Sequence, residues 1–126
     1  MVKRNKIVKK LDDTFSIYIR RRYAIDDLAE CFTCGKVDHW KNLQCGHFQS
    51  RRKYSTRWDK INCQVQCAKC NIFNQGEQYI FGKKLDKVYG EGTSNELALK
   101  GNYLVKFSTK EIELLINTYK DLINKL

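Results

Sequence analysis

The sequence predicts an α+β domain in which a cysteine-rich, metal-organised segment lies between helices. All six cysteines and both histidines fall within residues 31–70, and the chain on either side carries apolar side chains at helical spacing. The length of 126 residues is that of one domain, so we expect a single unit over residues 1–126.

The charge balance predicts a polyanionic partner. The chain has 24 Lys and Arg against 14 Asp and Glu, which gives a net charge of +10. Nucleic acid is the first candidate for such a basic domain. There is no apolar run near the roughly 18 residues of a membrane span, and no signal-peptide core, so we expect a cytoplasmic protein with no membrane partner. Disulfides are rare in that compartment, and the six cysteines therefore point to metal.

The segment before the first cysteine predicts one helix. Residues 12–29 carry apolar side chains at helical spacing, with a band of three arginines on the same segment. Residues 1–11 hold five Lys and Arg. We interpret them either as a mobile basic arm or as a solvated charged tail.

Three helices are expected after the cysteines. The first covers residues 76–90, and a short one runs from a Ser94 cap through Lys100. The clearest covers residues 108–126, because Ser108–Glu111 is a capping box. A single apolar stripe follows the box and comprises Ile112, Leu115, Ile116, Tyr119, Leu122, Ile123 and Leu126. It either packs into the core of the monomer or forms the contact of a homodimer.

Two C-x₂-C motifs predict a structural zinc site. Each motif places two thiolates on one tight turn, and four thiolates suit tetrahedral zinc. The four expected ligands are Cys31, Cys34, Cys67 and Cys70. Gly35, directly after the first motif, suits the positive φ that such turns need. Cys45 and Cys63 lack a C-x₂-C partner, and we expect them to be small buried side chains beside the zinc site.

The stretch between the two motifs holds the candidate chemistry. Residues 43–48 predict a strand that presents His47, and residues 59–66 predict a second strand leading into the second motif. Between them lies a loop rich in phosphate-binding side chains: Arg51, Arg52, Lys53 and Arg57. Trp58 is either a core residue or a contact for an unstacked base, and the core is favoured. After Cys70, residues 71–76 predict the start of a helix.

This order of residues resembles a known enzyme superfamily. The chain is similar to the HNH, or ββα-metal, endonucleases of the zinc-stapled kind. The order that carries this similarity is a C-x₂-C motif, His47, Asn62, and a second C-x₂-C motif followed directly by Asn71. A closer resemblance is to the phage NinG/Rap recombination proteins. The matching stretches are residues 15–20, 31–35, 44–48, 56–58, 62–67, 70–71 and 89–90. The resemblance implies a small ββα-metal, treble-clef-like finger flanked by helices.

The resemblance also implies roles for three residues. His47 would be the general base, Asn62 would orient the hairpin that carries it, and Asn71 would bind a catalytic cation such as magnesium. For both asparagines the alternative is an ordinary turn or cap hydrogen bond. Gly46 and Phe73 depart from the pattern, because many HNH enzymes have a metal-binding or catalytic side chain at or near those positions. The missing charge could come from Asp38, His39, Asp59 or Glu77.

The resulting prediction is a metal-dependent DNA endonuclease with zinc as structural and magnesium, or another divalent cation, as catalytic cofactor. The resemblance implies branched recombination intermediates, a Holliday junction or a flap, as the substrate in a bacterial or phage-infected host cell. The alternative is a zinc-finger nucleic-acid-binding module without catalysis. Because one chain carries one His47 and a four-way junction needs two cuts, a homodimer is also expected.

Overall fold

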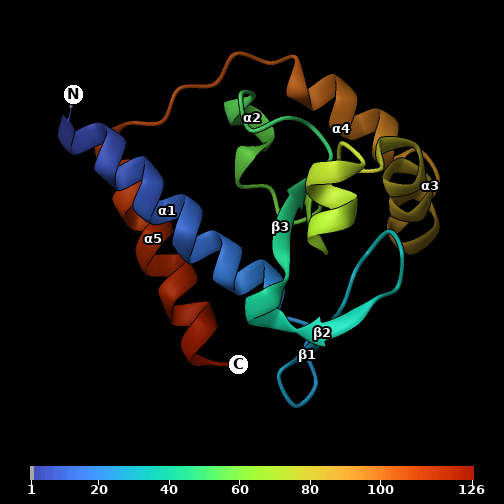
Figure 1. The fold of residues 1–126 in the computed structure, drawn as a ribbon. Coiled ribbons are helices and arrows are strands. Elements are labelled where there is room, and N and C mark those ends of the chain that lie inside the picture. The colour runs from blue at the N-terminus through green and yellow to red at the C-terminus, as the bar shows by residue number, and fades with distance from the viewer. Residues whose placement is uncertain (1) are drawn as a thin grey trace.

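The computed structural model describes residues 2–126 and confirms the mixed α+β class (Figure 1). The helices are α1 Val2–Arg21, α2 Tyr54–Arg57, α3 Gln78–Tyr89, α4 Thr93–Gly101 and α5 Thr109–Asn124. The strands are β1 Leu28–Glu30, β2 Val37–His39, β3 Gln44–His47 and β4 Cys63–Gln66. Two single turns complete the fold, a 3₁₀ turn η1 Trp40–Asn42 and a π turn η2 Lys69–Phe73. Over residues 2–126, no helix is long and apolar enough to cross a membrane.

Helices α1 and α5 lie side by side, and their facing side chains form one hydrophobic core (Figure 1). Phe15 and Tyr119 meet edge to face with ring centroids 4.8 Å apart. The buried members of this core are Leu11, Phe15, Ile19, Trp58, Cys63, Ile112, Ile116 and Tyr119. The interpretation of Trp58 as a core residue is therefore confirmed. The apolar stripe of α5 packs mainly within the monomer. The surface predicted to form a homodimer contact is therefore largely covered by α1.

The N-terminal arm is a correction to the sequence prediction. Residues 2–11 belong to the continuous helix α1, which begins ten residues earlier than expected and ends at Arg21. The apolar face continues to the N-terminal end, because Ile7 and Val8 pack against the core and Leu11 is fully buried. The expectation of a separate, mobile arm is wrong for these residues, whereas the lysines among them are exposed to solvent, as the alternative interpretation expected. The five basic side chains of this segment give it the composition of a charged tail, although apolar residues at helical spacing lie between them.

The strands form two separate antiparallel pairs. β1 pairs with β2 and was missed in the sequence, where residues up to 29 were expected to be helical. β3 pairs with β4, with His47 opposite Cys63 and Cys45 opposite Val65. β4 begins only at Cys63, because the Asp59 carboxylate accepts hydrogen bonds from the backbone N–H groups of Ile61 and Asn62 and holds a turn there.

The chain after β4 differs from the helix start expected at residues 71–76. The π turn η2 ends at Phe73, and Gln75, Gly76 and Glu77 then adopt positive φ. Three left-handed residues in succession interrupt any helix, so α3 begins at Gln78. The strand pair β3–β4 is thus followed by one helical turn rather than by a regular α-helix.

Helices α3 and α4 form a separate small core with Phe81, Leu85 and Leu97. Gly82 weakens helix propensity, but a Cβ there would lie 3.1 Å from the Phe48 ring, so the glycine allows the helix to approach β3. The predicted Ser94 cap is wrong. Gly92 is the N-cap of α4, and the Ser94 hydroxyl donates to Asp86 instead.

Candidate functional site

The four cysteines of the two C-x₂-C motifs form one cluster. Their sulfur atoms lie within 4.8 Å of one another, and the Cys34 and Cys67 sulfurs are 3.7 Å apart. A tetrahedron with Zn–S bonds of about 2.3 Å has sulfurs about 3.8 Å apart, so both the donor set and the spacing fit zinc. Cys31, Cys34, Cys67 and Cys70 could therefore hold a zinc ion, as the sequence predicted.

Backbone geometry supports this cluster. Gly35 has a φ of 81°, which confirms the expected left-handed turn after the first motif. Its N–H donates to the Cys31 carbonyl at 3.0 Å, and the Asn71 N–H closes the second motif on the Cys67 carbonyl at 3.0 Å. Burial opposes ionisation of the Cys31 thiol, but hydrogen bonds led by the Cys67 N–H outweigh it and lower the Cys31 pKa to about 6. This low pKa favours the Cys31 thiolate, the form that binds metal, whereas burial raises the pKa of Cys70 to about 12, so the Cys70 thiol would ionise only on binding the ion.

His47 ends β3 and is held in one tautomer. Its Nε2 lies 2.9 Å from the Arg57 carbonyl oxygen. A carbonyl only accepts, so Nε2 carries the proton and Nδ1 of the neutral ring is left as an acceptor. Burial lowers the pKa of His47 from its ordinary 6.5, although the Arg57 carbonyl offsets part of the effect. The imidazole is therefore neutral at pH 7 and able to accept a proton.

His47 and Asn71 line the same cavity, which has a volume of about 640 Å³. Polar side chains dominate its wall and come from distant parts of the chain. The polar lining residues are Asp12, Asp13, Ser16, Arg20, Gln44, His47, Arg51, Asn71, Gln75 and Gln78. The arrangement thus joins a proton acceptor, four amides, two carboxylates and two guanidinium groups around one space.

Asn71 is oriented inside this cavity. Its Nδ2 donates to the Gln44 Oε1 at 2.8 Å, which fixes the amide plane. Within residues 2–126, no hydrogen bond engages its Oδ1, which is the atom type that a hard cation prefers. Asp13 contributes a carboxylate to the same cavity and, among residues 2–126, forms an ion pair only with exposed Lys9, at 3.0 Å.

Asn62 lies beneath the loop rather than in the cavity. It is fully buried, its Oδ1 accepts from the Gln49 N–H at 2.7 Å, and its Nδ2 donates to the carbonyls of Gln49 and Thr56. These bonds tie the start and the middle of the loop between β3 and β4 to its last residue. They are backbone hydrogen bonds of the turn type given as the alternative for Asn62, and they hold the loop that follows His47.

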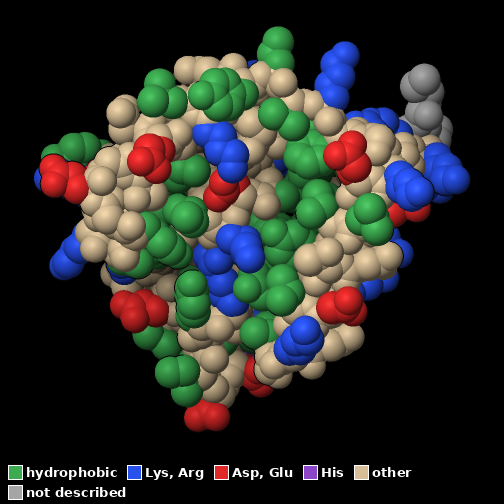
Figure 2. All heavy atoms as spheres, turned by 180° about the vertical axis from the view of Figure 1, so that it is seen from behind, with side chains coloured by type: hydrophobic (Ala, Val, Ile, Leu, Met, Phe, Trp, Pro, Cys, Tyr) green, Lys and Arg blue, Asp and Glu red, His purple; other side chains and the backbone are tan. Residues whose placement is uncertain are grey.

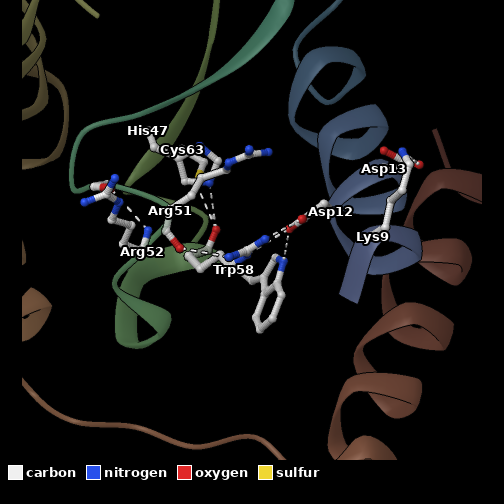
Figure 3. A network of polar contacts seen from close by, with 10 residues as sticks. Lys9, Asp12, Asp13, His47, Arg51, Arg52, Trp58 and Cys63 are labelled. Carbon is white, nitrogen blue, oxygen red and sulfur yellow. Dashed lines mark hydrogen bonds and ion pairs between the residues drawn. The ribbon is translucent and has the colours of Figure 1, made fainter. Parts of the chain in front are cut away.

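Asp12 connects helix α1 to this loop (Figure 3). Its carboxylate accepts two hydrogen bonds from the Arg57 guanidinium, at 2.6 and 3.0 Å, and one from the Trp58 indole at 2.9 Å. Arg57 also donates to the Arg51 carbonyl. The Asp12 hydrogen bonds raise the pKa of Arg57, so the pair is ionic. Arg57, predicted to contact DNA, is thus engaged within the protein.

The other predicted DNA-binding side chains lie next to the cavity. Arg51 and Arg52 are exposed, and Arg51 lines the cavity itself. Lys53 is half-buried, and its amine donates to the Gln49 Oε1. On the face shown in Figure 2, basic side chains are mixed with acidic and hydrophobic ones. Arg51 and Arg52 therefore place exposed positive charge beside His47.

The two departures from the HNH pattern have structural explanations. A Cβ at Gly46 would lie 1.8 Å from the Gln66 side chain, so no larger residue fits between these strands. Phe73 is 77 % exposed at the end of η2 and does not line the cavity. Neither position supplies a ligand to the site.

The groups proposed to replace the missing charge do not line the cavity. Asp38 and His39 belong to β2, and Asp59 binds Lys100 at 2.6 Å. Glu77 is the N-cap of α3 and also lies outside the lining. Sequence reasoning missed the carboxylates that do line it, Asp12 and Asp13. Their signal was a pair of adjacent acidic residues in an otherwise basic segment.

The predicted position of Cys45 and Cys63 beside the zinc site is also wrong. They do not lie beside the four-cysteine cluster; their sulfurs lie with a His47 ring nitrogen, all within 4.8 Å of one another. Cys63 is fully buried, and burial raises the pKa of its thiol well above 9.0. Cys45 is half-buried and lines the cavity.

Comparison with known protein families identifies the family of this chain. The family described as Bacteriophage Lambda NinG protein matches residues 1–126. The chain belongs to the NinG family. The NinG part of the predicted resemblance is therefore confirmed over the whole length. No curated protein and no solved structure matches the chain.

The match covers both halves of the site in this NinG-family chain. It includes helix α1, which supplies Asp12 and Asp13, as well as the cysteine-rich segment that supplies His47 and Asn71. Helix α1 and the cysteine-rich segment thus both belong to the region that the family shares.

Proposed function

We propose that this protein is a divalent-cation-dependent DNA endonuclease acting on branched recombination intermediates, a Holliday junction or a flap. The observation that carries the proposal is the state of His47. Its imidazole is neutral, and its Nε2–H donates to the Arg57 carbonyl, so Nδ1 is left as an acceptor. His47 also lines a polar cavity.

Hydrolysis of a phosphodiester needs an activated water and a counter-charge for the phosphate. His47 Nδ1 accepts the proton of the attacking water, which is general-base catalysis. Magnesium or another hard divalent cation, bound through oxygens of Asn71 and Asp13, would supply the counter-charge. Asn62 holds the loop after His47 in place through its bonds to Gln49 and Thr56.

Exposed arginines next to the cavity favour DNA as the substrate. Arg51 and Arg52 can contact phosphates on either side of the scissile bond, and such contacts raise affinity without reading sequence. The branched substrate is supported by the resemblance to the NinG/Rap recombination proteins.

A second candidate is a zinc-finger module that binds nucleic acid without cleaving it. The packing of Gly46 against Gln66 favours it, because no side chain can be accommodated where many HNH enzymes have a ligand or an acid–base group. The two candidates share the DNA-binding surface and differ in the role of His47.

Cleavage assays on a four-way junction, a flap and a linear duplex, with and without magnesium, separate these candidates. We expect magnesium-dependent cleavage of the branched substrates. His47→Ala should reduce the rate by at least about 10²-fold while leaving DNA binding intact. His39→Ala is the matched control, because His39 lies outside the cavity. Near-normal turnover in a folded His47→Ala protein would remove His47 from the mechanism, and binding without any cleavage would favour the zinc-finger module.

Resolution of a four-way junction also requires two active sites. One chain has one His47, so paired cuts imply a homodimer on the junction. The mass in solution, measured with and without junction DNA, tests this. A monomer in both states that makes only single nicks would restrict the activity to nicking or flap cleavage.

A further inference from the structure

A second group of metal-binding side chains lies on the β3–β4 hairpin. Cys45 and His47 are two residues apart on β3 and so point to the same face, and Cys63 is the cross-strand partner of His47. The two sulfurs and a ring nitrogen of His47 lie within 4.8 Å of one another. The pairing of the strands alone brings these three residues together.

The donor set selects a particular class of ion. Two thiolates and one imidazole suit zinc, whereas magnesium prefers oxygen ligands. Two thiolates also cancel the charge of a divalent ion. A neutral complex is the form that the buried position of Cys63 can tolerate.

The surroundings of His47 match those of a metal-binding histidine. Such a residue donates its second ring N–H to a carbonyl or carboxylate, which fixes the ring. Here Nε2–H is held by the Arg57 carbonyl at 2.9 Å, and the Arg57 guanidinium is in turn held by the Asp12 carboxylate. Nδ1 is the ring nitrogen without this bond and would be the ligand atom, and the Cys63 thiol, which donates to the same Arg57 carbonyl at 3.5 Å, would lose its proton on binding the ion.

The group is also accessible and open. Cys45 and His47 line the 640 Å³ cavity, so an ion can reach them from solvent. Three protein ligands leave the fourth tetrahedral position to water or a substrate oxygen. The four-cysteine cluster, in contrast, is complete with protein ligands.

We propose that Cys45, His47 and Cys63 form a second zinc site, and that zinc bound there switches the nuclease off by occupying His47. The binding half of this proposal stands on the hairpin alone, and the inhibition half rests on the proposed function. A ring nitrogen that donates its lone pair to zinc cannot also accept a proton from water. The first equivalent of zinc fills the four-cysteine cluster, and the second fills the hairpin site.

Zinc stoichiometry tests the binding half. After equilibrium dialysis against zinc chloride and removal of free metal, wild type should retain two zinc ions per chain. Cys45→Ser and His47→Gln should each retain one, with unchanged helical circular dichroism. His39→Ala, a histidine variant outside both clusters, should retain two. One zinc ion in wild type, or two in Cys45→Ser, would overturn the proposal.

An alkylation experiment needs no variant. Wild type is treated with iodoacetamide at one and at two zinc equivalents, and each cysteine is followed by mass spectrometry. Cys45 lines the cavity and should be modified at one equivalent but protected at two. Equal modification of Cys45 in both samples would contradict a zinc ion at this place.

Cleavage assays test the inhibition half. Adding the second zinc equivalent in constant magnesium should reduce wild-type cleavage by about 10²-fold, the effect of removing a general base. The ratio of rates with and without zinc should stay near one in Cys45→Ser. If two zinc ions bind and cleavage is undiminished, the inhibition half of the proposal is refuted, whereas the second zinc site still stands. A chain that cleaves nothing would refute the proposed function, while stoichiometry and alkylation still decide the zinc site.

Discussion

The four-cysteine cluster and the His47 cavity are built in opposite ways. The cluster takes all its ligands from two tight turns whose backbone hydrogen bonds fix the sulfurs. The cavity is assembled from helix α1, strand β3, the following loop and turn η2. Its key bonds join Asp12 to Arg57 and His47 to the Arg57 carbonyl. The cluster depends on local chain geometry, and the cavity depends on the packing of α1 and α5 behind it.

Removing zinc from the cluster should have the largest effect. Structural zinc contributes about 10–16 kcal/mol of binding free energy at pH 7, which matches or exceeds the whole stability of a typical domain. Chelation should therefore abolish cooperative unfolding and reduce helicity, as followed by circular dichroism. Re-addition of zinc, but not magnesium, should restore both. A chelated protein with full helicity and cooperative unfolding would count against a structural role.

Asp12→Asn should reveal how far the cavity depends on α1. The Asp12 and Arg57 side chains are only 18 % and 15 % exposed, so removing one charge leaves the other poorly solvated. We expect a loss of about 3 kcal/mol in the free energy of unfolding, measured by urea denaturation. Asp13→Asn is the neighbouring control. It removes only an exposed pair with Lys9 and should change stability by less than about 0.5 kcal/mol. Equal effects of the two variants would mean that Asp12 does not anchor the loop.

The pH dependence of cleavage and of stability should report the protonation of His47. Burial lowers its pKa below 6.5, so the cleavage rate should rise with pH, reach half its maximum below pH 6.5 and then level off. The same shift affects stability. As pH falls below 6.5, the unfolded chain binds the proton first, so the free energy of unfolding decreases toward the folded pKa. His47→Gln should lose this contribution to acid sensitivity, and His39→Ala should keep it. A rate profile centred above pH 6.5 would indicate another base.

The cysteine cluster could be predicted from the sequence because its chemistry is local. Two C-x₂-C motifs specify four ligands without knowledge of the fold. The capping box at Ser108 and Glu111 was equally readable and is formed as expected. His47, Asn62 and Asn71 were identified through the family resemblance, which fixes their order but not their surroundings. The structure then places His47 and Asn71 on the cavity and Asn62 below it.

The rest depends on contacts that the sequence does not encode locally. Asp12 meets Arg57 across 45 positions of the chain, so neither residue predicts the other. Arg57 looked like its exposed neighbours Arg51 and Arg52 because a charge pattern does not show which guanidinium is paired. The three-residue group of Cys45, His47 and Cys63 follows from strand register, which becomes known only when β3 and β4 are paired.

Asn71→Ala should test whether the cavity holds a cation. Loss of the Oδ1 ligand should raise the magnesium concentration for half-maximal cleavage by at least about tenfold, with the zinc of the cluster retained. Gln44→Ala, which removes the acceptor that orients the Asn71 amide but keeps the Asn71 Oδ1, should have a smaller effect in the same direction. An unchanged magnesium dependence in Asn71→Ala would mean that the cation is bound elsewhere.

The smallest expected effect concerns the outer loop. Arg51 and Arg52 are exposed beside the cavity, whereas Arg57 is bound to Asp12, so only the first two are free to contact phosphates. Replacing both with alanine should weaken binding to all DNA sequences alike. The log–log salt slope should fall by about 0.9 for each lost phosphate contact. A matched double variant at Lys110 and Lys125, exposed at the two ends of α5 and outside the cavity lining, should leave the slope unchanged. If the arginine variant instead weakens binding to one sequence only, these side chains read bases. The cavity would then have a recognition surface that the cysteine cluster lacks.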